Sequence, residues 1–264
     1  MLVTAETPAV EPFPDEFVTE YDAAVERIVL VHGSVTGGRS TWGATAEALA
    51  SVFEVVVLER PGFPGGPPAE RVDFAEQAEW LAGLLSPGDH LVGHSYGGVV
   101  SLLAAAVVPE RIASMTVVEP PCTRVAPDDP AVVAFARGGE ELWATGPRDD
   151  PDAFLRAFLK AVGSSLDPPS PLPPALEQAA RVLRDERGPW EAEIPLTALA
   201  AARIPTLVVS GRHHAAFDGI CDVLTESLGA ERADLPGYGH AAYRHPDFAP
   251  LLADVVTRAA ARRL

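Results

Sequence analysis

The sequence predicts an α/β protein with a mostly parallel central sheet of about eight strands, helices on both faces of the sheet, and a helical cap. Two observations predict this fold class. Short apolar runs that end in Gly, Pro or a polar residue alternate with helical patterns along most of the chain, which is typical of a parallel sheet covered by helices. The alternation is interrupted once, over residues 121–203. An excursion of that length between two strands indicates an inserted unit.

Five apolar runs are expected to form parallel strands that are buried on both faces. These runs are residues 27–31, 54–58, 90–93, 114–118 and 206–210, and residues 231–235 are expected to form the last strand. Right-handed crossovers are expected to join them. The first 25 residues contain Pro8, Pro12 and Pro14, and an antiparallel edge hairpin is expected there because Pro is tolerated at the edge of a sheet.

Helices are expected between these strands and within the excursion. Those that cover the sheet are residues 41–52, 74–85, 98–107, 217–228 and 246 to the C-terminus. Those of the excursion are residues 131–143, 151–162 and 175–186, with a Pro-rich joint at 167–174. The sequence therefore predicts a core formed by residues 1–120 and 204–264, and a helical cap or lid formed by residues 121–203.

Composition excludes several classes of function. The chain has 37 acidic and 20 basic side chains, a formal charge of −17, which repels nucleic acid and anionic membranes. The N-terminus has no signal-peptide pattern and no stretch reaches roughly 18 apolar residues, so a cytoplasmic protein without a membrane partner is expected. Cys122 and Cys221 have no metal-ligand or redox spacing. No metal and no cofactor are expected, and the sequence leaves the oligomeric state open.

Ser95 is the first candidate for chemistry. It lies in the stretch Gly93-His94-Ser95-Tyr96-Gly97, between a predicted strand and a predicted helix. A tight strand-to-helix turn holds its central residue at strained angles, and glycines two positions before and after remove side chains that would collide there. The helix N-terminus also favours a developing anion. Serine is a common helix cap as well, but the strand-turn-helix context favours a nucleophile.

Two other stretches supply the remaining parts of an acyl-transfer site. Val31-His32-Gly33-Ser34 ends an earlier predicted strand, and the backbone N–H groups of Ser34 and Tyr96 are the candidate oxyanion hole. His32 is expected to brace this loop. His240 ends the Gly-rich stretch Leu235-Pro-Gly-Tyr-Gly-His and is the candidate general base.

These motifs together resemble the α/β-hydrolase fold superfamily. The motifs His-Gly-Ser at 32–34, Gly-His-Ser-Tyr-Gly-Gly at 93–98 and Gly-Tyr-Gly-His at 237–240 occur in the family's order, and Glu-Arg-Pro-Gly at 59–62 resembles the loop after the family's fourth strand. The resemblance covers the chain from about residue 27 to the end. It implies a cap after the family's sixth strand and a Ser-His-acid triad in which Ser95 attacks a carbonyl and His240 takes its proton.

The acid of this triad departs from the common pattern. Most family members carry it after the strand that matches residues 206–210, but this chain has Arg212-His213-His214 there and no carboxylate before Asp218. A minority place the acid after the sixth strand, and Glu119 occupies that position here. Because the two strand ends are neighbours, a carboxylate there can reach the same imidazole. Glu119 is the favoured acid, and Asp218 is the alternative.

The substrate pocket is the least determined part of the prediction. His32, Trp143 and His214 are the named candidates for contact with a small-molecule substrate. The cap is expected to supply an apolar pocket, with candidate residues Phe135, Leu142, Trp143, Phe154, Phe158 and Trp190. The favoured function is a serine hydrolase (esterase type) acting on an ester, thioester or lactone of a small or medium molecule. The alternatives are a lyase or cyclase on the same fold, and a ligand-binding protein that has kept the fold.

Overall fold

The computed structural model describes residues 25–263, and its sheet has six parallel strands in the order β2-β1-β3-β4-β5-β6. The strands are β1 (Arg27–Val31), β2 (Glu54–Leu58), β3 (Asp89–His94), β4 (Ile112–Val118), β5 (Thr206–Ser210) and β6 (Glu231–Asp234). The six strands that were located in the sequence are all present, and each boundary lies within two residues of its prediction. The sheet of the described residues has six strands, whereas about eight were expected. The expected edge hairpin falls on residues that lie outside the described range.

Nine α-helices lie among the described residues. They are α1 (Gly38–Leu49), α2 (Phe74–Leu84), α3 (Tyr96–Val107), α4 (Pro130–Thr145), α5 (Pro151–Ala161), α6 (Pro174–Asp185), α7 (Leu196–Ala202), α8 (Ala215–Leu228) and α9 (Phe248–Ala261). Three of them, α4 to α6, begin with Pro, which fits the first turn because its missing N–H has no intrahelical partner there. Asp129 and Asp150 cap α4 and α5 by accepting hydrogen bonds from backbone N–H groups of the first turn.

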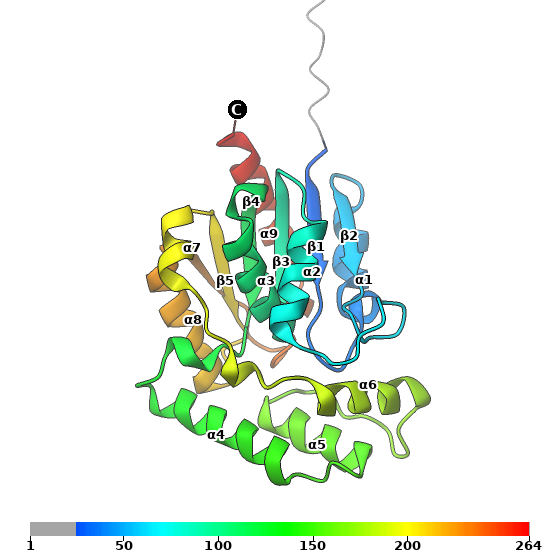
Figure 1. Cartoon of the computed structure of the whole chain (residues 1–264). Coiled ribbons are helices and arrows are strands. Elements are labelled where there is room, and N and C mark those ends of the chain that lie inside the picture. Colours follow the sequence, from blue (N-terminus) through cyan, green and yellow to red (C-terminus); the bar gives the residue numbers. More distant parts are fainter. Residues whose placement is uncertain (1–24, 264) are drawn as a thin grey trace, which may run out of the picture.

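Helices cover both faces of the sheet. One apolar cluster joins α1 and α9 to side chains such as Ile28, Leu30 and Val209. The other cluster joins α2, α3, α7 and α8 to the opposite faces of the same strands, including Val29 and Val208. Figure 1 shows α2 and α3 in front of the sheet and α9 behind it. Successive side chains of a strand point to opposite faces of the sheet, and helices cover both faces. This explains why strands such as β1 and β5 are nearly continuous apolar runs.

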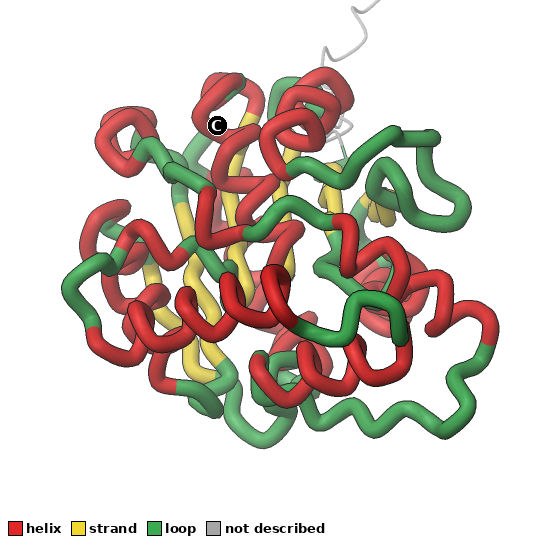
Figure 2. The backbone as a smooth tube through the Cα atoms, turned by 60° about the horizontal axis from the view of Figure 1, so that its bottom comes forward, coloured by secondary structure: helices red, strands yellow, loops and turns green. Residues whose placement is uncertain are grey.

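Helices α4, α5 and α6 lie across the ends of the strands, below the sheet in Figure 1 and in front of it in Figure 2. They follow β4, which takes the place of the family's sixth strand. The predicted range 121–203 also contains α7, which the sequence analysis missed. Helix α7 packs on α3 and α8 at the face of the sheet. We therefore propose a division in which the cap is formed by α4–α6 and α7 belongs to the core.

The cap has its own small apolar cluster. Phe154, Leu155 and Leu159 of α5 pack against Ala180 and Leu183 of α6. No helix within residues 25–263 is both long and apolar enough to cross a membrane.

Candidate active site

Ser95 stands at the turn from β3 to α3. Its φ of 52° is positive, a conformation that costs a non-glycine residue energy and persists where the surrounding structure enforces it. The glycines predicted to permit the turn do so by close approach: a Cβ on Gly97 would lie 2.3 Å from the His32 carbonyl oxygen, and one on Gly93 would lie 2.4 Å from Ser101 Oγ. The Ser95 side chain is thereby held at the carboxyl end of the sheet.

Ser95, His240 and Glu119 form a continuous hydrogen-bonded chain. Nε2 of His240 lies 2.9 Å from Ser95 Oγ, and Nδ1 of the same ring lies 2.8 Å from Glu119 Oε2. All three residues are buried. Such a chain allows a hydroxyl to give up its proton to the imidazole while the carboxylate stabilises the charge that results.

Glu119 reaches His240 because its backbone turns sharply at the end of β4. Its φ is 46°, and its Oε1 accepts a 2.6 Å hydrogen bond from the Gly211 N–H after β5. Burial alone would raise the pKa of this carboxyl group, but the contacts that His213 and His240 make with it outweigh burial and hold the pKa below its usual range. The group is therefore ionised beside the imidazole.

Asp218, the alternative acid, is directed elsewhere. It lies in the first turn of α8, and its Oδ1 accepts a 2.6 Å hydrogen bond from Ser210 Oγ. Arg212 NH1 lies 3.5 Å from the same oxygen. Within the described residues, Asp218 makes no hydrogen bond to His240.

His94 supports the loop that carries His240. Its Nε2 donates a 2.8 Å hydrogen bond to the backbone carbonyl of His240, and its ring packs against Trp42 and Tyr243. Burial lowers the pKa of His94 to about 3, so the ring is neutral at ordinary pH.

The two candidate oxyanion donors lie on either side of Ser95. Tyr96 is the first residue of α3, and Ser34 follows β1. Within residues 25–263, neither backbone N–H has a hydrogen-bond acceptor in the protein. Both groups are therefore available to an oxygen bound beside Ser95.

His32 does not contact the candidate substrate site. Its ring is fully buried, with Nδ1 2.7 Å from the Gly33 carbonyl oxygen and Nε2 accepting a hydrogen bond from the Arg60 N–H. Burial lowers its pKa well below the usual value. Both nitrogens are engaged inside the protein, so the expected substrate contact is wrong and the expected bracing of the loop is the role that its position fits.

A buried ion pair joins the cap to the loop of Ser34. Glu186, which follows α6, has its Oε1 2.7 Å from NH2 of the fully buried Arg60. Its Oε2 accepts a hydrogen bond from Ser34 Oγ, and its backbone carbonyl accepts one from Trp143 Nε1. Burial raises the pKa of Glu186, and Arg60 opposes that rise. The paired guanidinium also offsets the negative charge that Glu186 brings close to the oxyanion donors.

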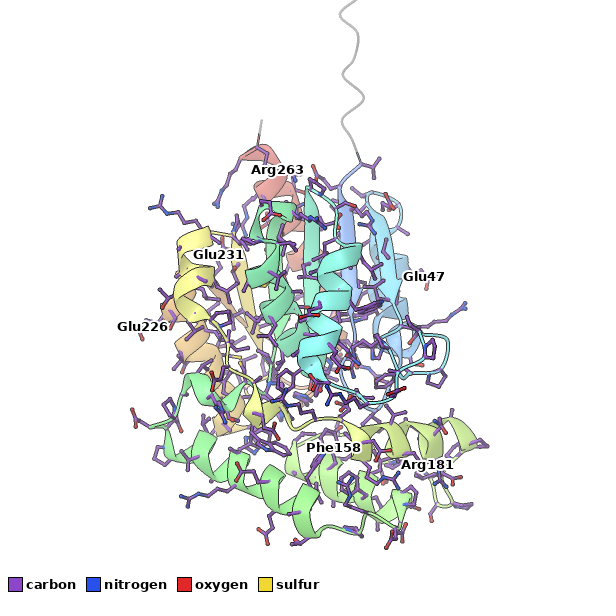
Figure 3. The ribbon with its side chains drawn as sticks, viewed as in Figure 1. Glu47, Phe158, Arg181, Glu226, Glu231 and Arg263 are labelled. Carbon is purple, nitrogen blue, oxygen red and sulfur yellow. The ribbon has the colours of Figure 1, made fainter. Side chains whose placement is uncertain are left out.

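Two cavities meet at Ser95. The first is apolar and small, about 40 Å³, and lies between the cap and the sheet. Its lining includes Phe135, Leu142, Trp143, Phe158 and Trp190. The second, about 210 Å³, is lined by polar residues such as Ser164, Ser165 and Arg244 as well as by Phe158. Phe158 of α5 lies between the cap helices and the sheet, as Figure 3 shows, and borders both cavities.

Two of the predicted pocket residues lie away from these cavities. Phe154 is fully buried inside the cap and packs on Trp143. His214 caps α8, where its Nδ1 accepts a hydrogen bond from the Ala216 N–H and its ring packs on Phe135. His214 lines neither cavity, so the described residues give no support to its predicted contact with substrate.

Residues 28–249 match the Alpha/beta hydrolase family. The chain belongs to this family. Among curated relatives, it is 32% identical over 178 residues to the pimeloyl-[acyl-carrier protein] methyl ester esterase of Aeromonas hydrophila, a match that covers 66% of this chain and 64% of the relative. It is 26% identical over 221 residues to the putative carbamate hydrolase RutD of Azorhizobium caulinodans, covering 80% of this chain and 75% of the relative. The chain spans less than two thirds of the length of the pimeloyl-ester relative.

Solved structures of the family have the same fold. MenH from S. aureus has a TM-score of 0.67 at 18% identity, with 90% of this chain and 97% of that chain covered. An alpha/beta hydrolase from Sphaerobacter thermophilus has a TM-score of 0.65 at 26% identity, with 87% and 92% covered. The family's α/β-hydrolase fold, expected from the motifs, is confirmed.

The sequence analysis did not identify three residues of the candidate site, which are Arg60, Glu186 and His213. Arg60 belongs to a motif that was noticed for its resemblance alone, and Glu186 comes from the distant end of the cap. His213 was noted only as part of a loop that lacks a carboxylate, but its Nδ1 lies 3.2 Å from Glu119 Oε1. A buried carboxylate that needs partners is the one signal that points toward His213.

Donor atoms of Glu119, His213 and His240 all lie within 4.8 Å of one another, a distance compatible with a bound metal ion. Their arrangement fits hydrogen bonding better. Nδ1 of His240 and Oε2 of Glu119 are only 2.8 Å apart, whereas a tetrahedral zinc ion with bonds of about 2.0 Å needs its ligand atoms about 3.3 Å apart.

Proposed function

We propose that this protein is a serine hydrolase of the carboxylic-ester type that acts through an acyl-enzyme. The observation that carries the proposal is the hydrogen-bonded chain from Ser95 through His240 to Glu119, next to two free backbone N–H groups and an apolar cavity. The activities for which the two relatives are named, methyl ester esterase and putative carbamate hydrolase, support hydrolysis at a carbonyl.

In this proposal Ser95 Oγ attacks the substrate carbonyl while His240 Nε2 takes the hydroxyl proton. The N–H groups of Ser34 and Tyr96 stabilise the oxyanion, and Glu119 stabilises the imidazolium. His240 then gives the proton to the leaving group, and a water activated by the same imidazole releases the acid product.

The two cavities suggest how the substrate is oriented. The apolar cavity suits a short acyl chain, because burial of apolar atoms is favourable and the cavity has room for only a few non-hydrogen atoms. The larger polar cavity suits the leaving alcohol or thiol. The proposed substrate class is accordingly an ester or thioester with a short apolar acyl group.

The proposal is tested by intact mass after reaction with a fluorophosphonate. One adduct is expected on the wild-type protein and none on Ser95→Ala, and His240→Ala is expected to react far more slowly. Ester turnover in both variants should fall by roughly 10³-fold or more, because nucleophile and base act as a unit. No wild-type adduct, or an equal adduct on Ser95→Ala, would exclude the acyl-enzyme and leave the lyase, cyclase or binding alternatives.

A further inference from the structure

His213 lies between the cap and the carboxylate of Glu119. It follows β5, and its side chain is only 12% exposed. Nε2 lies 3.0 Å from the backbone carbonyl oxygen of Val162, which ends α5 of the cap. Nδ1 lies 3.2 Å from Glu119 Oε1, the oxygen that His240 does not use. The imidazole therefore spans the distance from the cap to the acid of the proposed triad.

Both atoms that face this ring are hydrogen-bond acceptors. A neutral imidazole has one N–H and can donate to only one of them, so its other nitrogen would present a lone pair to an oxygen. The imidazolium has two N–H groups and suits both. Nδ1 is buried without a well-aligned hydrogen bond, so its contact with Glu119 is chiefly an ion pair.

The surroundings of the ring favour the charged form. Burial opposes it, but the Glu119 carboxylate, the Val162 carbonyl and the more distant Asp218 of α8 together raise the pKa of His213 above its usual value of 6.5. The other titratable neighbours are His240 and His214, whose ring centroids lie 5.8 and 6.2 Å away. Phe217 of α8 stacks on the ring at 5.6 Å.

We propose that His213 is a positioning residue that, as an imidazolium, ties the end of cap helix α5 to Oε1 of Glu119, the carboxylate oxygen that does not bond to His240. The proposal rests on the proposed function, because it assigns Glu119 to the triad. Loss of the proton removes one of the two contacts. Val162, which lines both cavities, then loses its bond to the core, or Glu119 loses the cation at Oε1.

We therefore expect kcat/KM to fall at alkaline pH. Activity is expected to fall as the pH rises through the pKa of His213, because the deprotonated ring loses one of its two contacts. The fall is expected to be roughly tenfold, the size that follows from the loss of one hydrogen bond of about 1.4 kcal/mol.

Two substitutions separate the two contacts. The amide nitrogen of glutamine lies near the position of Nε2, so His213→Gln keeps a donor for Val162 and removes the cation at Glu119. The amide nitrogen of asparagine lies near Nδ1, so His213→Asn keeps a donor for Glu119 and releases the cap. We expect His213→Gln to lower kcat with KM nearly unchanged, and His213→Asn to raise KM with kcat nearly unchanged. Neither variant should show the alkaline fall.

His245→Asn is the matched control, since His245 lies on the far side of the His240 loop and contacts Asp247 and Tyr238. It should keep the wild-type pH profile. An alkaline fall that persists in both His213 variants would overturn the proposal.

An NMR titration of the seven histidines tests the same idea without any substrate. The His213 ring signal is assigned by its loss in His213→Asn. Its midpoint is expected above pH 6.5 in the wild type and lower in Glu119→Gln, and a midpoint at or below 6.5 in the wild type would overturn the proposal. Fluorophosphonate labelling of Ser95 is read separately, so a failure of the proposed hydrolase function is distinguished from a failure of the role of His213.

Discussion

At the scale of single residues, the position of the acid determines how the site works. Glu119→Gln keeps the shape of the side chain but loses the charge that stabilises the His240 imidazolium. We expect a fall in turnover of up to about 10⁴-fold. Asp218→Asn should change turnover little, because Asp218 bonds to Ser210 instead. Steady-state kinetics of both variants on one ester decides between them, and the reverse pattern would assign the acid to Asp218.

Arg60 forms the buried ion pair with Glu186. Arg60→Ala leaves the Glu186 carboxylate buried without its partner, and removal of one partner of a buried pair costs about 3–5 kcal/mol of unfolding free energy. Urea unfolding measures the loss. Arg71→Ala is the matched control, because its pair with Glu76 lies in solvent and its removal should not change stability measurably. Equal effects of the two substitutions would contradict a structural role for the buried pair.

The candidate site residues that lie in local motifs could be predicted from the sequence. Those that are brought to the site only by tertiary contacts could not. Ser95 and His240 follow strands at positions fixed by glycine turns, and Glu119 lies at a strand end. Glu186 meets Arg60 across 126 residues of chain, and no local pattern encodes that contact. His213 and His214 are neighbours in the sequence, but only His213 contacts Glu119, while His214 caps α8.

At the scale of elements, helix α5 controls the size of the substrate site. Phe158 separates the apolar cavity from the polar one, so Phe158→Ala joins the two. The preferred acyl chain of 4-nitrophenyl esters should then lengthen, with kcat/KM rising roughly fourfold for each methylene that gains a buried position worth about 0.8 kcal/mol. The measurement is a series from acetyl to octanoyl.

Phe154→Ala is the control for this series. Phe154 lies on the same helix and is fully buried, but it lines neither cavity. Its removal should lower the melting temperature without changing the preferred chain length. A shift in preference of equal size in both variants would show that cap stability, and not cavity shape, sets the preference.

The elements themselves were largely predictable. Strands buried on both faces are continuous apolar runs, and their boundaries are marked by Gly, Pro and polar residues. Helix α7 was missed because its sequence, Leu196–Ala202, is short and lies inside the Pro-rich excursion. Its assignment to the core depends on contacts with α3 and α8 that periodicity does not encode.

At the scale of the whole molecule, buried neutral histidines make folding sensitive to acid. The pKa of His94 is about 3 and that of His32 is well below 6.5, both because of burial. Below pH 6.5 the unfolded chain binds protons at these positions and the folded chain does not, so stability falls as the pH falls. Each such group contributes about 1.4 kcal/mol per pH unit.

Urea unfolding between pH 7 and pH 5 measures this slope. His94→Gln removes one of these groups, so its unfolding free energy should depend on pH less steeply than that of the wild type. The difference in slope should correspond to about one proton taken up on unfolding. The comparison uses slopes, because the substitution also changes packing against Trp42. An unchanged slope would mean that His94 binds a proton in the folded protein.

More hydrogen bonds join the cap to the core beside Glu186 than beside residues 163–173, and we expect this difference to govern how a substrate reaches Ser95. At one end, Arg187 N–H donates to the Val72 carbonyl, beside the bonds that Glu186 makes to Arg60 and Ser34. At the other end, within the described residues, residues 163–173 make their backbone hydrogen bonds to the cap itself, and His213 holds only Val162. We therefore expect the substrate to arrive through the polar cavity at this second end. Its acyl chain enters the apolar cavity last, and the leaving group is then the part nearest to solvent and the first product to depart.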